Sequence, residues 1–209
     1  MNGARGRTSP PGAGRHGPDT TPEDTTMEFL NTIKARIPDY AKDVRLNLDG
    51  AIARSSLPVR EAVGSALAAA YACRSTPIVD AIRQGDALEP ADVQGALAAA
   101  ALMGMNNVWY PYVEMSGDSE LATLRPELRM NAYANHGGVD RRAFETWALA
   151  ASIVGKCGHC VSSHYRLLKE SGATVQQLRD VGRIAAVISA AAHVIAVEAA
   201  STETLRAAA

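Results

Sequence analysis

The sequence predicts an all-α protein, folded as one compact, multi-helix domain. Alanine recurs throughout a chain that is 47% hydrophobic but only 5% aromatic, and alanine has the highest helix propensity of all residues. Apolar residues recur at helical spacing, and no stretch shows the two-residue alternation that is typical of strands. A chain of 209 residues can bury one sizeable core, whereas two full domains would be a tight fit.

The folded domain is expected over residues 27–209. Residues 1–26 contain no Val, Ile, Leu, Phe, Trp or Tyr, while Gly and Pro recur. Such a segment buries too little surface to offset its ordering entropy, so we expect a disordered tail. From Thr26 onward Phe29 and Ile33 lie on one helix face, and Pro38 is expected to start a second helix.

Two further helices are marked by prolines at their starts. Pro58 opens a run that ends near residues 75–77, and Pro90 opens a longer run through Met105. A loop-rich passage that includes Tyr110–Pro111 is expected to follow.

The C-terminal helices carry clear start and stop signals. Asp140 is the expected N-cap of a helix that Gly155 ends. A second helix is predicted over residues 157–170, before Ser171–Gly172. Thr174 and Gln177 match a capping box that opens the last helix.

One spacing suggests that the domain is built from two related helical halves. Glu61 and Cys73 are separated by the same interval as Glu145 and Cys157, with an offset of 84 residues. Repeated spacing is typical of a duplicated unit, and the first half would lack the chemistry of the second.

Composition argues against several classes of protein. A net charge of −1 gives no electrostatic basis for binding nucleic acid or an acidic membrane surface. Three cysteines are too few, and odd in number, for a secreted disulfide framework. The sequence shows neither a signal peptide nor an apolar run of about 20 residues, so we expect a cytoplasmic protein.

The stretch KCGHCVSSH (156–164) is the most reactive part of the sequence. A thioredoxin-type centre would follow a β-strand, but the preceding residues, FETWALAASIVGK, have a helical pattern. Cys157, Cys160 and His164 share one helix face, yet no second Cys or His pair completes a structural zinc site. The remaining interpretation is a dithiol at a helix N-terminus, where the helix dipole stabilises a thiolate.

Two further side chains fit acid–base work beside such a dithiol. His164 lies one turn beyond Cys160 and can exchange a proton with a thiol. Glu145, on the preceding helix between Phe144 and Trp147, is the candidate carboxylate to orient that histidine. A glutamate on a helix is more often a solvated surface residue, and only the resemblance described next selects this one.

This constellation resembles the alkyl hydroperoxide reductase D family of the carboxymuconolactone decarboxylase-like superfamily. The resemblance extends to IPDYAKDVRLNL (37–48), ALMGMNNVWY (101–110) and LRPELRMNAYAN (124–135). It implies a homotrimer and a lipoyl-dependent peroxidase, with no tightly bound cofactor or metal. Electrons would come from a dihydrolipoyl group on the dihydrolipoamide succinyltransferase and pass to an organic hydroperoxide or to a peroxiredoxin, alkyl hydroperoxide reductase C.

The same resemblance assigns roles to individual residues. Cys160 would attack the peroxide and become a sulfenic acid; Cys157 would donate a proton and then close the Cys157–Cys160 disulfide. His164, His159 and Glu145 would form the proton relay. Helix-dipole reasoning instead favours Cys157 as the more reactive thiolate, because it lies nearer the helix N-terminus.

Rival functions are a non-enzymatic redox adaptor, a metal-binding helical module and a superfamily decarboxylase. The intact dithiol argues against the decarboxylase.

The remaining chemically reactive residues are expected to have structural roles. His193 is expected to be a core or interface histidine, and Cys73 a small buried hydrophobe. The aromatic residues 109–112 fit either plain packing or the wall of a hydroperoxide pocket.

Overall fold

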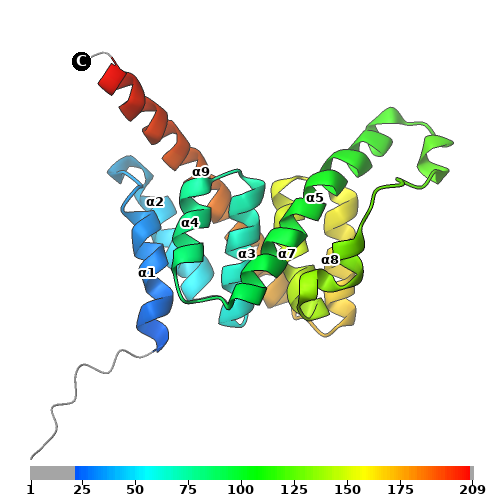
Figure 1. Cartoon of the computed structure of the whole chain (residues 1–209), viewed down its shortest axis with the longest axis horizontal. Coiled ribbons are helices and arrows are strands. Elements are labelled where there is room, and N and C mark those ends of the chain that lie inside the picture. The colour runs from blue at the N-terminus through cyan, green and yellow to red at the C-terminus, as the bar shows by residue number, and fades with distance from the viewer. Residues whose placement is uncertain (1–21, 208–209) are drawn as a thin grey trace, which may run out of the picture.

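A computed structural model describes residues 22–207, and that part of the chain is helical without a strand, as the sequence predicts (Figure 1). Its α-helices are α1 (Pro22–Lys34), α2 (Lys42–Leu48), α3 (Val59–Ala72), α4 (Thr76–Gln84), α5 (Pro90–Ser116), α6 (Asn131–Ala134), α7 (Arg141–Val154), α8 (Gly158–Glu170) and α9 (Val175–Ala207). Short 3-10 turns, η1 (Asp39–Ala41), η3 (Leu121–Thr123) and η4 (His136–Gly138), and a π-turn, η2 (Asp49–Ala53), connect them.

The core is centred on α3 and α7, which pack against each other and against α5 and α9. Every residue from Glu61 to Ala70 on α3 is buried, as is every residue from Ala143 to Ser152 on α7. Helices buried on all sides belong at the centre of a bundle. Small residues allow the close approach: a Cβ added to Gly64 would lie 2.8 Å from Cζ2 of Trp147 and closer still to its indole nitrogen.

The predicted helix signals near the C-terminal half are confirmed. The Asp140 side chain accepts the Ala143 N–H at 3.0 Å, and Gly155 is the C-cap of α7. In the capping box, Thr174 and Gln177 each accept the other's backbone N–H, at 3.1 and 3.0 Å.

Two predicted boundaries differ from the structure. The first helix begins at Pro22 rather than near Thr26, and the rest of the expected tail lies outside the described residues. The predicted end of α5 at Met105 is wrong, because the helix continues to Ser116 with Pro111 inside it. Proline keeps a φ angle compatible with a helix and removes only one backbone hydrogen bond, so α5 continues through Tyr110–Pro111. The helix ends later, at Gly117, which has the left-handed conformation.

The structure supports two related halves but corrects their offset to 82 residues. Arg74 and Lys156 both have positive φ, at 58° and 55°. The bonds that end α3, Cys73 N–H to the Ala69 carbonyl and Ser75 N–H to the Ala70 carbonyl, recur 82 residues later at the end of α7. Helices α3, α4 and α5 therefore correspond in order to α7, α8 and α9.

In this register, residues of the first half that cannot form a redox centre take the places of the reactive side chains. Ser75 corresponds to Cys157, Ile78 to Cys160 and Ile82 to His164, while the predicted match of Cys73 with Cys157 is wrong by two positions. Ile78 and Ile82 are fully buried in the core. The first copy thus contributes packing where the second carries the dithiol.

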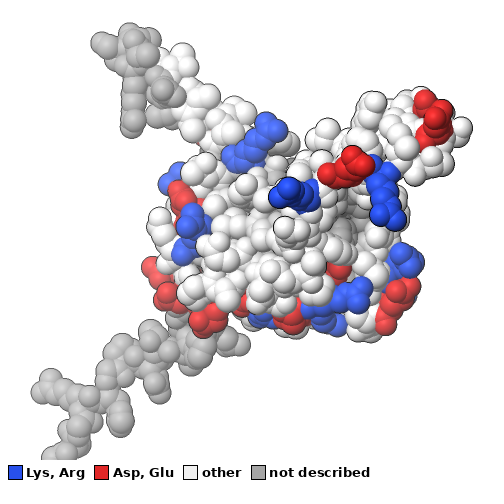
Figure 2. Space-filling view, turned by 45° about the vertical axis from the view of Figure 1, so that its right-hand side comes forward, with Lys and Arg blue, Asp and Glu red and all other residues white. Residues whose placement is uncertain are grey.

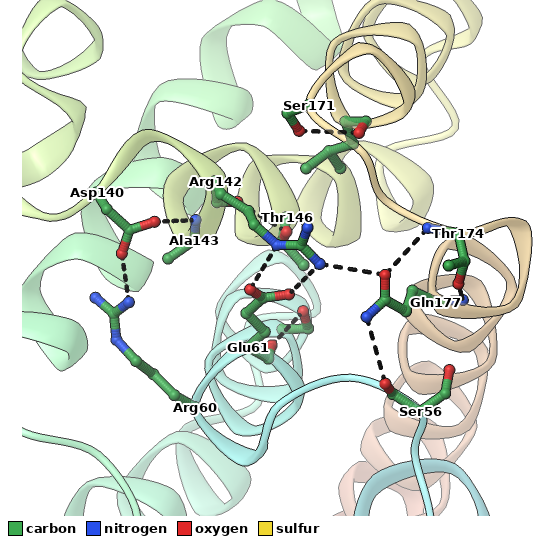
Figure 3. A network of polar contacts seen from close by, with 12 residues as sticks. Ser56, Arg60, Glu61, Asp140, Arg142, Ala143, Thr146, Ser171, Thr174 and Gln177 are labelled. Carbon is green, nitrogen blue, oxygen red and sulfur yellow. Dashed lines mark hydrogen bonds and ion pairs between the residues drawn. The ribbon is translucent and has the colours of Figure 1, made fainter.

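A polar network joins the two halves at the end of the bundle away from the dithiol (Figure 3). Arg142 of α7 donates to the buried Glu61 of α3 at 2.8 Å and to Gln177 of α9 at 3.2 Å. Arg60 pairs with Asp92 and also with Asp140. These bonds fix the relative positions of α3, α5, α7 and α9.

Helix α9 is long and apolar enough from Val175 to Ser201 to pass for a membrane span by length and composition. Here one of its faces packs into the bundle, where Ile184 and Ile188 are fully buried. The buried Asp180 on this helix also accepts the backbone N–H and hydroxyl of Ser56, at 2.8 and 2.7 Å.

Candidate active site

The two cysteines lie where α7 ends and α8 begins. Cys157 is the N-cap of α8, and its Sγ accepts the backbone N–H of Cys160 at 3.2 Å. The two sulfurs are joined in a disulfide, with 5.3 Å between the Cα atoms. Both residues are buried. An N–H group at a helix N-terminus stabilises negative charge on sulfur, so this position suits a thiolate.

Buried next to the dithiol is a histidine–carboxylate pair. Nδ1 of His164 lies 2.6 Å from Oε2 of Glu145 and donates to it, because an ionised carboxylate can only accept. Both side chains are almost completely inaccessible to solvent, at 5% and 2%. Nε2 of His164 faces the thioether of Met103 at 3.2 Å.

A tyrosine completes the surroundings of the carboxylate. The Tyr133 hydroxyl, from α6, donates to Oε1 of Glu145 at 2.8 Å. Burial by itself would raise the pKa of Glu145, but the hydrogen bond and charge of His164, together with the Tyr133 hydroxyl, outweigh it and hold the pKa below its usual value. Burial and the neighbouring carboxylate raise the pKa of Tyr133 to about 12.

A cavity of about 230 Å³ opens over this group. Its walls include Cys160, His164, Tyr133 and Asn106, whereas Cys157 is not among the residues that line it. Of the two sulfur-bearing residues, Cys160 is therefore the one that a small molecule in the cavity would meet. Cavities of about 150 Å³ hold benzene, so a small organic molecule fits this space.

His159 lies at the mouth of the cavity rather than beside the buried pair. Its exposed ring stacks on Tyr110, with centroids 4.1 Å apart and planes 18° from parallel. Both rings also line a larger groove of about 710 Å³, between the outer half of α5 and α8. Within residues 22–207, no hydrogen bond joins His159 to His164 or Glu145.

The back of the disulfide rests against α5. The Sγ of Cys157 is 3.8 Å from the Asn106 carbonyl oxygen. The next residue, Asn107, donates to the Ala151 carbonyl at 3.1 Å, and its side chain fills the space above Gly155. The position of α5 thus fixes the dithiol from behind.

Comparison with known proteins places this chain in a family. Residues 119–203 match the carboxymuconolactone decarboxylase family. Over 173 residues the chain is 44% identical to a protein of Rhodospirillum centenum named alkyl hydroperoxide reductase AhpD, covering 82% of this chain and 92% of that one. This chain belongs to the AhpD family. Relatives of the same name from Bradyrhizobium and Streptomyces avermitilis are 41% and 42% identical, covering 82% and 83% of this chain and 94% and 99% of theirs.

The structure brings together four of the five site residues predicted from the sequence. Cys157, Cys160, His164 and Glu145 form one buried group, and His159 reaches only its outer edge. Sequence reasoning gave no role to Tyr133, Met103 or Asn106. All three lie in the stretches that resemble the AhpD family, and this was the available signal for them.

Two other expectations need correction. His193 is exposed on the surface of α9, so it is not a core histidine, and of the two expected places only an interface stays a prediction. Cys73 is only half-buried rather than enclosed, since it lies at the C-cap of α3, and burial raises the pKa of its thiol.

The geometry also bears on the metal-binding alternative. The sulfurs of Cys157 and Cys160 are bonded to each other, and the nitrogens of His164 face Glu145 and Met103. Among the residues that the structure describes, no three His, Cys, Asp or Glu side chains are grouped to hold a metal ion.

Proposed function

We propose that this protein is an antioxidant dithiol peroxidase that reduces organic hydroperoxides to alcohols. One observation carries the proposal. Cys160, half of a disulfide-forming pair, lines a cavity together with His164, whose ring is bound to the buried Glu145. A thiol, an acid–base group and an orienting carboxylate are the components of an activated nucleophile.

The first step is attack by the Cys160 thiolate on the outer oxygen of the hydroperoxide. The O–O bond breaks, the alkoxide takes a proton to become the alcohol, and Cys160 becomes a sulfenic acid. We assign this role to Cys160 rather than Cys157, because Cys160 lines the cavity while Cys157 lies behind it against Asn106.

The second step closes the disulfide. The Cys157 thiol loses its proton and attacks the sulfenic sulfur, and hydroxide leaves as water. We place His164 and Glu145 in the relay that moves these protons, since they are hydrogen-bonded to each other next to Cys160. His159, at the cavity mouth, would exchange protons with solvent.

A dihydrolipoyl group would restore the dithiol. One of its thiolates attacks Cys160, Cys157 leaves as a thiolate that the Cys160 N–H stabilises, and the second lipoyl thiol releases the mixed disulfide. The groove of about 710 Å³ beyond His159 would take the lipoyl arm, because it leads to the cavity along apolar residues such as Trp109 and Leu124.

The partners and the assembly follow the same proposal. The donor would be the lipoylated dihydrolipoamide succinyltransferase, and an alkyl hydroperoxide reductase C-type peroxiredoxin would be a second acceptor, in the cytoplasm. A homotrimer is supported by apolar side chains that stay exposed on α5: Val108, Tyr112 and Met115 are 70%, 51% and 80% accessible. The centre of the face in Figure 2 also carries few charged residues.

A redox adaptor is the second candidate. It would pass electrons from the donor to a peroxiredoxin through the same disulfide without reducing hydroperoxides itself. The exposed stack of His159 on Tyr110 at the site entrance fits a surface that meets a protein partner.

Peroxide consumption with dihydrolipoamide as sole reductant tests the proposal and separates the two candidates. Wild type should turn over, Cys157→Ser and Cys160→Ser should not, and Glu145→Gln should be slower by about 10- to 100-fold. Cys73→Ser is the matched control, because this free cysteine lies outside the site, and it should keep full activity. If wild type consumes no peroxide but still transfers electrons to a peroxiredoxin, the peroxidase proposal is excluded and the redox adaptor is the remaining function.

A further inference from the structure

Both oxygens of the Glu145 carboxylate are occupied, by partners from different parts of the fold. His164 of α8 binds Oε2, and Tyr133 binds Oε1. Tyr133 belongs to α6, a short helix in the connection between α5 and α7, and not to either helix that flanks the dithiol. A carboxylate held by two donors cannot rotate to serve one of them without losing the other.

Tyr133 is itself fixed by aromatic neighbours. Its ring meets Phe144 edge-on, with centroids 5.9 Å apart, and His136 with centroids 6.3 Å apart. The side chain is half-buried and also lines the cavity over Cys160. Because its pKa is raised to about 12, the hydroxyl stays protonated and can only donate to Glu145 at the pH values at which an enzyme works.

We propose that Tyr133 is a positioning residue, whose hydroxyl holds the Glu145 carboxylate ionised and oriented for His164. This role of Tyr133 rests on the proposed function, in which Glu145 and His164 move protons to and from the Cys160 thiol. Tyr133 acts through Glu145 and does not take part in bond making or breaking.

The charged surroundings of Glu145 set the expected direction of the pH effect. They comprise His164, Tyr133 and the Arg141 guanidinium, while Tyr110 acts electrostatically on Tyr133. A hydrogen bond to the ionised form lowers the pKa of a carboxylic acid. Removing the hydroxyl therefore raises the pKa of Glu145, so less acid is enough to neutralise the carboxylate and it loses its charge at a higher pH.

Tyr133→Phe removes this hydroxyl and keeps the ring contacts. We expect the pH at which the Cys160 thiolate appears, followed by thiolate absorbance of the reduced protein, to rise by about one unit, since a hydrogen bond to a charged group is worth roughly tenfold. The acid limb of peroxide turnover should move the same way, with turnover near pH 6 falling about tenfold and turnover at alkaline pH close to wild type. Tyr165→Phe, which alters an exposed tyrosine on α8, is the control and should leave both profiles unchanged.

Coupling to Glu145 separates positioning from a general structural role. In a Glu145→Gln background, Tyr133→Phe should cause no further shift of either profile, because the charge that the hydroxyl supports is gone. A wild-type profile in folded Tyr133→Phe would overturn the proposal, and so would an equal shift in the Glu145→Gln background. The thiolate titration needs no turnover, so it decides the role of Tyr133 even if wild type proves inactive and the proposed function fails.

Discussion

Gly155 lies behind the dithiol, and adding one methyl group there should lower the stability of the fold. A Cβ there would lie 2.7 Å from the Asn107 Cβ and still closer to its amide group. The Asn107 side chain must then move and give up its 3.1 Å bond to the Ala151 carbonyl. Overpacking costs roughly 1–3 kcal/mol and the lost hydrogen bond about 1 kcal/mol, so Gly155→Ala should destabilise the fold by about 3 kcal/mol.

Thermal unfolding followed by circular dichroism measures this change. For a chain of this size, about 3 kcal/mol corresponds to a fall in Tm of roughly 6–12 °C. Gly104→Ala is the matched control: it lies on the same helix as Asn107, with no atom within 4 Å of the added Cβ, so better helix propensity should raise Tm slightly. Peroxide turnover should fall in Gly155→Ala and hold in the control. A Gly155→Ala protein as stable as wild type would refute the packing argument.

Three other variants test features away from the dithiol. Arg142→Leu leaves the buried carboxylate of Glu61 without its cation, and Tm should fall by roughly 4–8 °C for a loss of about 2 kcal/mol; an unchanged Tm would contradict a structural role for the network. Burial would raise the pKa of Asp180, but the two hydrogen bonds from Ser56, followed by those from Arg183 and Arg179, hold it well below its usual range. Asp180 therefore stabilises the fold above its unfolded pKa of about 3.9 and loses this effect in acid. Asp180→Asn should therefore be less stable than wild type at pH 7 by about 2 kcal/mol, and urea unfolding should show the difference shrinking below pH 4. Ser75→Cys combined with Ile78→Cys should form a disulfide, because these positions repeat the backbone of the redox pair. Thiol counting on the oxidised protein should then find one free thiol, that of Cys73, and three free thiols would argue against the repeat.

The sequence predicted those parts of the fold that depend on local signals. Asp140, Gly155 and the Thr174–Gln177 box each act on backbone groups within a few residues, so their effect can be deduced without tertiary contacts. The end of α5 could not be predicted from Pro111. A proline that ends a helix and one that lies inside it cannot be distinguished in the sequence until the packing of the neighbouring turns is known.

The candidate site was predictable only where its residues are close in sequence or carry a recognisable pattern. The group from Cys157 to His164 is one continuous segment, and the resemblance supplied Glu145. Tyr133 and Met103 reach the same site from distant segments, and neither spacing nor composition indicates such a contact. The offset of the repeat could not be predicted correctly either. The Glu and Cys residues of the two halves match at a separation of 84 residues, whereas the backbone turns that define the repeat are 82 residues apart and are visible only in the structure.

Cys157 caps α8 with its sulfur while that sulfur is also part of the disulfide. A free thiolate would accept the same N–H, so the first turn of the helix keeps its cap in both oxidation states. The hydrogen bond that starts α8 would therefore not have to break when the disulfide is reduced.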